Sequence, residues 1–309
     1  MALAGAEATI EPASEPVEPE RKRRLRLTPY LLLLPGIAWL AIFFVWPMFT
    51  LAKTSLSSQD LAGDYVFSWH FQTYKDAFSL YHSQFVRSFI YAAIATASAL
   101  AISFPLAYTI AFKSGKWKNL LLVLVIAPFF TSFLIRTLAW QTILADNGIV
   151  SKIFNDLGLY NVLKALHLVQ SDQLLNTPFA VISGLTYNFL PFMTLPLYAS
   201  LEKIDLRLLE AGADLYGSPW TTFRKVTWPL SLPGVVAGTL LTFIPAAGDY
   251  INSKLLGNVN TTMIGQVIDG QFLRVLDYPT ASALSFSLML AILIIVIIYI
   301  RRAGTEELV

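Results

Sequence analysis

The 309-residue chain contains no cysteine and few charged residues. The absence of cysteine excludes disulfides, thiolate zinc sites and cysteine nucleophiles. Its three histidines, His70, His82 and His167, are scattered and do not have the spacing of metal ligands. Charged residues make up 14% of the chain, whereas soluble domains carry roughly 25%. Together these shortages argue against a soluble domain and against a thiol- or metal-dependent enzyme.

The chain also lacks a phosphate-binding loop. The motif Gly-x-x-x-x-Gly-Lys-Ser/Thr, whose backbone amides cradle the phosphates of ATP, is absent. Gly115 and Lys116 resemble it only locally, because the preceding glycine and the following hydroxyl are missing. The apolar parts of the chain contain no cluster of nucleophile, base and metal ligands. We therefore expect no enzymatic activity from this chain, and no bound cofactor or metal.

Long apolar runs are what the chain does have, and 55% of its residues are hydrophobic. Each run has about the length that crosses ~30 Å of hydrocarbon at about 1.5 Å per residue. The third run (119–135) is expected to continue past Arg136 to about Leu144, and the fifth run (226–248) past Asp249 to about Leu255. The pattern predicts an all-α, polytopic membrane protein with six transmembrane helices and a membrane domain over residues 29–303. The six runs are 27–52, 88–112, 119–135, 173–201, 226–248 and 278–300.

Basic residues predict the orientation of these helices. Fourteen of the 22 lysines and arginines lie in the N-terminal segment, in residues 113–118, in residues 202–232 and in the C-terminal tail. Because cytoplasmic loops are enriched in Lys and Arg, both termini and residues 202–232 are expected in the cytoplasm. Residues 1–28 are predicted to be a disordered basic tail and residues 304–309 a second cytoplasmic tail. Topology accounts for the basic cluster before the first span, so no nucleic acid partner is expected.

The loops on the opposite side are substantial. Residues 53–87 are expected to form a strand-like or short helical excursion followed by an amphipathic helix. Residues 145–172 contain two turn signals, Asn147-Gly148 and Leu157-Gly158, which indicate short helices between turns. Residues 256–277 are expected to be irregular.

Residues 202–233 form the one long charged, amphipathic interval between two apolar spans. Asp205 is suited to cap a helix at its N-terminus, and Gly217 suits the left-handed position at its C-terminus. The apolar side of this helix would consist of Leu208, Leu209 and Leu215.

A second helix is expected immediately after Gly217. Ser218 would cap it, with Pro219 in the first turn, where a missing N–H has no cost. Pro229 and Pro233 are expected to end it before the next span. The interval is therefore predicted to be a helix-turn-helix on the cytoplasmic face of the membrane.

Glu210-Ala211 and the later Val226-Thr227-Trp228-Pro229 resemble the EAA loop of binding-protein-dependent ABC importer permeases. The family pattern is Glu-Ala-Ala, three residues, Gly, nine residues, then Ile-x-Leu-Pro. The chain departs from it at Gly212, at Tyr216, where the glycine comes one residue late, and at Trp228. The resemblance implies that the loop docks into a groove of an ATP-binding subunit. The residues that it assigns to coupling are Glu210, Ala211, Asp214, Tyr216 and Gly217.

Further stretches resemble the spermidine/putrescine importer permeases, over roughly residues 30–303. They are Ser132–Trp140, Tyr187–Phe192, Ile244–Tyr250, Leu255–Gly265 and Gln271-Phe272. The resemblance implies a type I ABC importer permease (MetI-like) fold in a bacterial inner membrane, in which access alternates between the two sides. It also implies the partners: two ATP-binding subunits that use ATP and Mg, a second permease subunit of different sequence, and an extracytoplasmic polyamine-binding protein. The loops outside would form the platform for that protein.

Several residues in or beside the spans are candidates for a substrate pathway or gate. Asp249 either attracts a cationic substrate or pairs with Arg136, which a continuous third span would place at similar depth. Aromatic faces attract cations, which makes the nearby aromatic residues candidates as well. The full set is Asp249, Tyr250, Tyr187, Asn188, Trp140 and Arg136.

Two other functions compete with polyamine import. The same fold could import another small organic solute, such as an opine or an amino-acid derivative. An ion-coupled secondary transporter would instead require intramembrane acidic relays or inverted repeats. The sequence contains one intramembrane acid, Asp249, and no clear repeat.

Overall fold

The computed structural model describes residues 28–59 and 65–303, which divide into two units, residues 1–48 and residues 49–309. Apart from Thr28, the predicted tails at 1–28 and 304–309 lie outside the described residues. In the first unit, α1 (Thr28–Leu40) continues through a π-helical turn (Ala41–Val45) into the start of α2 (Trp46–Ser55). The described side chains of α1 from Leu31 onward are nearly all exposed and apolar, which suits a helix surrounded by lipid or protein. The first predicted span is therefore a helix.

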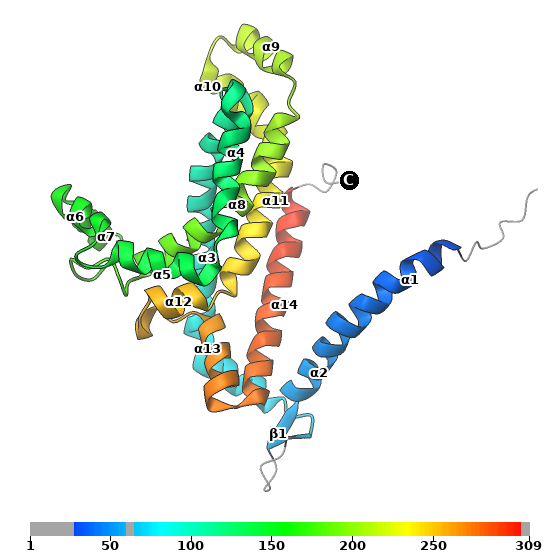
Figure 1. The fold of residues 1–309 in the computed structure, drawn as a ribbon. Coiled ribbons are helices and arrows are strands. Elements are labelled where there is room, and N and C mark those ends of the chain that lie inside the picture. Colours follow the sequence, from blue (N-terminus) through cyan, green and yellow to red (C-terminus); the bar gives the residue numbers. More distant parts are fainter. Residues whose placement is uncertain (1–27, 60–64, 304–309) are drawn as a thin grey trace, which may run out of the picture. The chain divides into compact units, whose positions relative to one another are not determined.

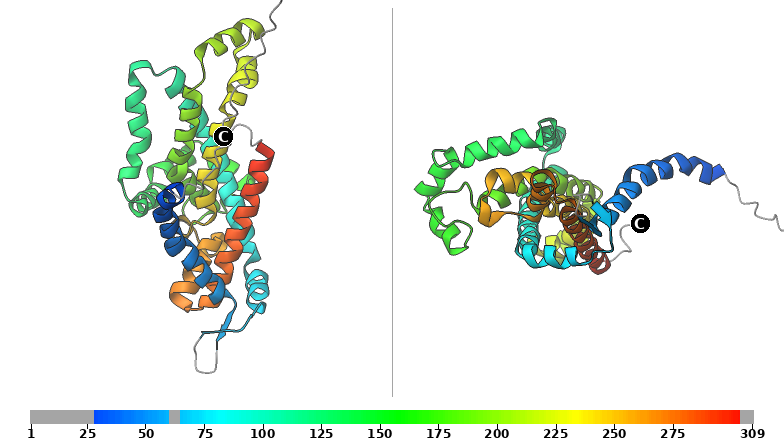
Figure 2. Two further views of the ribbon diagram at one scale, coloured as in Figure 1. Left: turned by 90° about the vertical axis from the view of Figure 1, so that its right-hand side faces the viewer. Right: turned by 90° about the horizontal axis from the view of Figure 1, so that it is seen from below.

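Three long helices form the centre of the second unit: α3 (Gln72–Phe112), α8 (Pro178–Glu202) and α11 (Trp228–Ala247) (Figures 1 and 2). A fourth helix, α14 (Tyr278–Ala303), packs mainly against α3. The face of α3 toward this bundle carries small, buried residues three or four positions apart, which lie on one side of a helix. Small residues allow helix backbones to approach closely in a membrane. These residues are Ala92, Ala95, Ala99, Ser103 and Ala107.

The contact between α8 and α11 depends on two glycines four residues apart. A Cβ on Gly234 would lie 2.6 Å from Ser200 Cβ, and one on Gly238 would lie 2.8 Å from Met193 Sδ. Hydroxyl groups add specificity on the other side of α8, where the Thr194 hydroxyl donates to Ser103 Oγ at 2.8 Å. The bundle is therefore close-packed on both sides of α8.

The third predicted span is bent rather than straight. It begins as α4 (Lys118–Ile126), passes through a 3-10 turn (Ala127–Phe130), and resumes as α5 (Phe133–Leu144) at an angle of 97°. The extended backbone of Thr131 makes the break. The prediction that the third span continues as one straight helix to about Leu144 is therefore wrong, because the helix axis turns after Phe130. The predicted end is correct, since α5 ends at Leu144. Five long apolar helices and this bent pair account for the six predicted spans.

An arm of short helices leaves the bundle after α5 (Figure 2). It consists of α6 (Ile149–Asp156) and α7 (Leu159–Ala165), separated by Gly158, whose φ of 65° is left-handed. These elements confirm the short helices that were predicted from the turn signals in residues 145–172.

The two other loops that were predicted to lie outside agree with the predictions only in part. Strands β1 (Ser57–Gln59) and β2 (Tyr65–Phe67) pair antiparallel, as expected for a strand-like excursion. The amphipathic helix that was expected next is continuous with the second span in α3, which runs for 41 residues. Residues 256–277 are not irregular, because they include α13 (Ile264–Gly270) and a π-helical turn (Gln271–Val275). Elements this short contain too few turns to show an apolar periodicity in the sequence.

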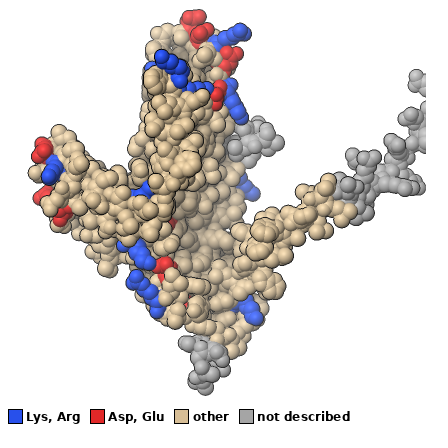
Figure 3. Space-filling model, in the orientation of Figure 1, with Lys and Arg blue, Asp and Glu red and all other residues tan. Residues whose placement is uncertain are grey.

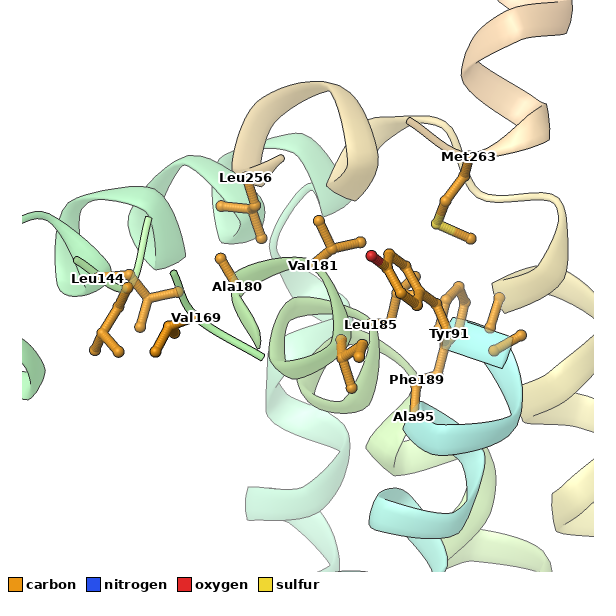
Figure 4. Close-up of a cluster of buried hydrophobic side chains, with 14 of the residues drawn as sticks. Tyr91, Ala95, Leu144, Val169, Ala180, Val181, Leu185, Phe189, Leu256 and Met263 are labelled. Carbon is orange, nitrogen blue, oxygen red and sulfur yellow. The ribbon is translucent and has the colours of Figure 1, made fainter. Parts of the chain in front are cut away.

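A buried apolar cluster holds α5, α8 and the segment after α11 in place (Figure 4). Val181, Leu185 and Phe189 of α8 contribute one side of it. Leu144 at the end of α5 and Leu256 belong to the same cluster, and both are fully or almost fully buried. Packing of this density fixes the position of the polar side chains that lie between these segments.

Candidate functional site

The fifth span breaks next to the candidate acid. Helix α11 ends at Ala247, and a short helix α12 (Ile251–Leu256) starts after residues 248–250 (Figure 1). Helix α12 packs against α5 and α8. Non-helical backbone at membrane depth is tolerated where it is buried in protein or lines a cavity. The break therefore marks a place where the permeation pathway could pass.

Asp249 is buried within this break, with 8% of its surface exposed. Its Oδ1 accepts a hydrogen bond from the backbone N–H of Asn252 at 2.7 Å and so caps the first turn of α12. The Asn252 side chain, which is fully buried, accepts from Asn188 Nδ2 at 3.0 Å. The same Asn188 nitrogen donates to Thr137 Oγ1 at 3.1 Å. A continuous polar chain thus connects Asp249 on the fifth span with α8 and α5.

A second set of hydrogen bonds ties α12 to α13. The Ser253 hydroxyl donates to Gln266 Oε1 at 2.7 Å and accepts from the backbone N–H of Met263 at 3.0 Å. Gly265 lies directly against the helix break, because a Cβ there would be 2.3 Å from the carbonyl oxygen of Gly248. The position of Asp249 therefore depends on α13 as well as on the membrane helices.

Replacing Gly265 by alanine is expected to lower the thermal stability of the protein. The added methyl group would meet backbone atoms of Gly248 and Asp249, which cannot rotate away as a side chain could. Overpacking of this kind costs about 1–3 kcal/mol. Gly270→Ala in the same helix is the matched control, because a Cβ there meets nothing within 4 Å. Thermal melting of the two purified variants checks this, and equal melting temperatures would contradict it.

Arg136 is also buried, with 8% exposed, but it does not meet Asp249. Its guanidinium lies over the rings of Phe129 and Phe133, at 5.8 and 5.5 Å from their centroids. No ion pair joins Arg136 and Asp249 in residues 28–59 and 65–303. The argument for their pairing assumed a straight third span, whereas Arg136 lies beyond the bend.

Two aromatic candidates form a stacked pair beside the polar chain. The rings of Trp140 and Tyr187 are parallel, at an interplanar angle of 2° and with centroids 5.2 Å apart. Trp140 Nε1 donates to Ser183 Oγ at 3.3 Å, and the Tyr187 side chain remains partly exposed. The pair therefore offers an aromatic face to a cation.

Tyr250 follows Asp249 directly and is 41% exposed. The Lys254 ammonium lies 5.8 Å from its ring centroid and also pairs with Asp269 at 2.8 Å. The structure thus gathers Trp140, Tyr187, Asn188 and Asp249 around one polar chain, with Tyr250 beside it.

Sequence reasoning missed several members of this site: Thr137, Ser183, Asn252, Ser253 and Gln266. Each is a neutral polar residue that belongs to no motif in the sequence. The signal that could have found Thr137 and Asn252 is their closeness in sequence to the two charged residues, Arg136 and Asp249.

The loop between α8 and α11 has the predicted first helix. Helix α9 (Leu206–Tyr216) is capped by Asp205, whose Oδ1 accepts from the backbone N–H of Arg207 at 2.9 Å. Gly217 ends α9 in the left-handed conformation, with φ of 63°. Of the three predicted apolar residues, Leu209 packs against the helix bundle, while Leu208 and Leu215 are exposed. The apolar side is therefore only partly covered by the chain itself.

The second helix of the loop differs from the prediction. Helix α10 (Pro219–Thr222) begins after Ser218 as expected, but Ser218 makes no side-chain capping bond. Pro229 and Pro233 do not end it, because α10, a π-helical turn (Phe223–Thr227) and α11 form one helix of 29 residues. In the π-turn the N–H of Trp228 bonds to the carbonyl of Phe223, five residues earlier. The wider turn before Pro229 gives the helix a way to continue through the prolines.

All five residues that resemble the coupling motif are exposed on α9 or at its end: Glu210, Ala211, Asp214, Tyr216 and Gly217. Gly212, which replaces the second alanine of the motif, is buried, and a Cβ there would lie 3.0 Å from a methyl group of Thr222. A groove of about 390 Å³ lies between α9 and the π-turn with the start of α11, and its mostly apolar lining includes Leu208, Leu215 and Val226 together with Lys225. Charged side chains gather at this end of the unit, as Figure 3 shows. The loop therefore presents a charged surface with an apolar groove.

Comparisons with known proteins agree with these observations. Residues 103–303 match the family described as "Binding-protein-dependent transport system inner membrane component". The chain is 35% identical over 265 residues to the spermidine/putrescine transport system permease protein PotB of Haemophilus influenzae, covering 85% of this chain and 90% of the relative. It is 36% identical over 268 residues to PotB of Salmonella typhimurium, covering 86% and 91%. It is also 33% identical to the inner membrane ABC transporter permease protein YdcU of Escherichia coli, over 72% of each chain.

Two solved structures show the same fold. A bacterial ABC transporter that imports the acidic polysaccharide alginate superposes with a TM-score of 0.60 at 19% identity, over 91% of this chain and 96% of that one. A bacterial alginate ABC transporter in complex with an alginate pentasaccharide-bound periplasmic protein gives 0.60 at 20% identity, over 90% and 94%. The chain has the type I ABC importer permease fold with six membrane spans. It belongs to the inner membrane components of binding-protein-dependent transport systems, and it is a multi-pass permease subunit of an ABC importer.

Proposed function

We propose that this permease imports polyamines such as spermidine and putrescine. The observation that carries the proposal is Asp249, a buried carboxylate at a helix break, which hydrogen bonds connect through Asn252 to Asn188, the residue that follows Tyr187 of the stacked Trp140–Tyr187 pair. A polyamine is a flexible chain with several ammonium groups. A carboxylate attracts one ammonium group, and each aromatic face adds about 0.5–2 kcal/mol of cation–π attraction. Identity of 35–36% to spermidine/putrescine permeases over most of the chain also favours this substrate class.

The pathway residues have distinct roles in this proposal. Asp249 provides the charge, and Asn188 holds the polar chain that connects α8 with α12. Trp140 and Tyr187 provide an aromatic face along the route, and Tyr250 lies beside it with the Lys254 ammonium near its ring. Arg136 belongs to the gate rather than to the cation site, because a guanidinium repels an ammonium group.

The working assembly would contain further subunits. An extracytoplasmic protein delivers the polyamine, and a second permease subunit, a different chain, completes the pathway. Two ATP-binding subunits use ATP and Mg and contact the loop at residues 202–233. The loop and both termini are cytoplasmic in this arrangement, as the distribution of Lys and Arg favours.

Closure of the ATP-binding subunits would move α9 and switch access between the two sides. The EAA-like residues Glu210, Ala211, Asp214, Tyr216 and Gly217 are the contact through which this movement is transmitted. Since unpaired backbone groups cannot face lipid, the switch must consist of rigid movements of helices.

Substrate-dependent ATP hydrolysis tests the proposed substrate class. The complete complex would be reconstituted in lipid with its extracytoplasmic protein and supplied in turn with spermidine, putrescine, an opine and an amino-acid derivative. We expect the two polyamines to stimulate hydrolysis at least fivefold, with omission of the extracytoplasmic protein as the control. Stimulation by the opine or the amino-acid derivative alone would assign the permease to that substrate class instead.

A further inference from the structure

The Lys254 side chain of α12 contacts a carboxylate and an aromatic ring at the same time. Its ammonium nitrogen lies 2.8 Å from Asp269 Oδ2 and 5.8 Å from the centroid of the Tyr250 ring. A carboxylate pairs with an ammonium ion through charge-assisted hydrogen bonds, and an aromatic face attracts it through cation–π interaction. Asp269 and Tyr250 therefore form a binding site for an alkylammonium group, and in this structure a lysine of the same chain occupies it.

This ammonium site is accessible to other cations. The side chain of Lys254 is 36% exposed and that of Asp269 is 14% exposed. The second carboxylate oxygen, Asp269 Oδ1, accepts no hydrogen bond within residues 28–59 and 65–303, and the protein does not enclose it. A carboxylate can accept several hydrogen bonds through its two oxygens. A second ammonium group can therefore reach Asp269 while Lys254 is still bound.

The contact between Lys254 and Asp269 is not needed to hold α12 against α13. Hydrogen bonds of the buried Ser253 with the Gln266 side chain and the Met263 backbone already join the two segments. Exposed ion pairs contribute little to stability, because water solvates both charges when the pair is open. The Lys254 side chain can therefore leave Asp269 without loss of structure.

The site lies next to the helix break at Asp249. Gly265 of α13 meets this break directly, since a Cβ there would be 2.9 Å from the carbonyl oxygen of Asp249. Asp269 follows Gly265 by one turn of α13, so the two lie on the same side of the helix, about 6 Å apart along its axis. Tyr250 is the residue after Asp249. A molecule with more than one ammonium group can therefore engage Asp269 as well as Asp249.

We propose that Asp269 and Tyr250 bind one ammonium group of a polyamine during transport, and that Lys254 takes its place when no substrate is present. This rests on the proposed function, because it takes a polyamine as the substrate. A polyamine must displace Lys254, which lowers the apparent affinity of the site. The return of Lys254 to Asp269 then releases the ammonium group. Weak binding suits transport, since a substrate that is bound too tightly does not leave.

Equilibrium binding of labelled putrescine tests the site. The complete complex would be placed in lipid nanodiscs without its extracytoplasmic protein, so that this protein does not bind the probe. Lys254→Met keeps the apolar part of the side chain but removes the ammonium group, and we expect it to bind putrescine at least tenfold more tightly than the unmodified complex. Lys254→Arg keeps the charge and should bind putrescine no more tightly than the unmodified complex. Equal affinity of Lys254→Met and the unmodified complex would overturn the proposal.

A second set of variants separates a specific site from a general change of charge. Removing any nearby cation favours the binding of another, so the gain in affinity must also depend on Asp269. Adding Asp269→Asn to Lys254→Met should abolish the gain. Lys164→Met is the matched control, because Lys164 forms an exposed ion pair of the same length, 2.8 Å, with Asp172, and its affinity should equal that of the unmodified complex. A gain that persists in the double variant, or an equal gain in Lys164→Met, would contradict the site.

Stimulation of ATP hydrolysis distinguishes failure of this site from failure of the proposed function. If the variants bind putrescine as expected but polyamines do not stimulate hydrolysis, the ammonium site stands and the proposed substrate is wrong. If polyamines stimulate hydrolysis but all variants bind putrescine equally, the site is wrong and the proposed substrate stands.

Discussion

Replacing Glu210 by alanine is expected to reduce polyamine uptake more than tenfold, while the extracytoplasmic protein still binds its ligand. The Glu210 side chain is exposed on α9 and makes no hydrogen bond or ion pair in the described part of the chain. Helix α9 is held to its own subunit by Leu209 and Gly212 instead, so the fold does not depend on Glu210. Loss of this carboxylate should therefore affect the contact with the ATP-binding subunit and leave the permease folded.

Uptake of labelled polyamine into cells or proteoliposomes measures this effect, together with ATP hydrolysis by the purified complex. Asp156→Ala removes an exposed acid from α6, far from the loop in sequence, and should leave both rates unchanged. Glu210→Gln removes the negative charge but keeps the size and shape of the side chain, so it shows whether uptake depends on the charge. If Glu210→Ala transports and hydrolyses at the normal rates, Glu210 has no part in coupling.

Replacing Asp249 by asparagine should lower polyamine uptake by a similar factor, for a different reason. The asparagine oxygen can still accept the hydrogen bond from the Asn252 N–H, so the cap of α12 is retained. The negative charge is lost, and with it the attraction for an ammonium group in a site of low dielectric constant. We expect assembly and basal ATP hydrolysis to persist and the stimulation by polyamine to disappear.

The double exchange Asp249→Arg with Arg136→Asp distinguishes a substrate site from an internal ion pair. Because the two residues form no ion pair here, the exchange should not restore uptake. Restored uptake would mean that they pair in another state of the transport cycle. Normal uptake by Asp249→Asn alone would remove Asp249 from the pathway altogether.

Much of the fold was predictable because its signals are local. Apolar runs identified the six spans, and the cap at Asp205 and the glycine at 217 located both ends of α9. The bend after Phe130 has one local marker, Pro128 in the 3-10 turn that precedes it, but membrane helices also tolerate proline without a change of direction, so the marker does not predict the bend. The continuation of the helix through Pro229 and Pro233 depends on a π-turn, which has no signature in composition.

The candidate site was predicted through its charged and aromatic members. Asp249, Trp140 and Tyr187 stand out in apolar surroundings, and the structure places them around one polar chain. Thr137 and Asn252 join that chain only because α5, α8 and α12 meet in space. Contacts between residues 50 or more positions apart have no counterpart in the periodicity of a sequence, so only the closeness of Thr137 and Asn252 to Arg136 and Asp249 pointed to them.

The single helix from Pro219 to Ala247 connects the loop at residues 202–233 with the break at Asp249. Its 29 residues correspond to about 43 Å at about 1.5 Å per residue. When a helix of that length tilts as a rigid body by about 10° around one end, its other end moves by roughly 7 Å. This displacement is larger than the rise of about 5.4 Å in one helical turn. A small tilt of this helix around its end at the loop therefore moves the end next to Asp249 by more than the width of an ammonium group. The helix is expected to bend at the π-turn (Phe223–Thr227), where its hydrogen-bond pattern changes, and bending there would reduce the displacement of the far end.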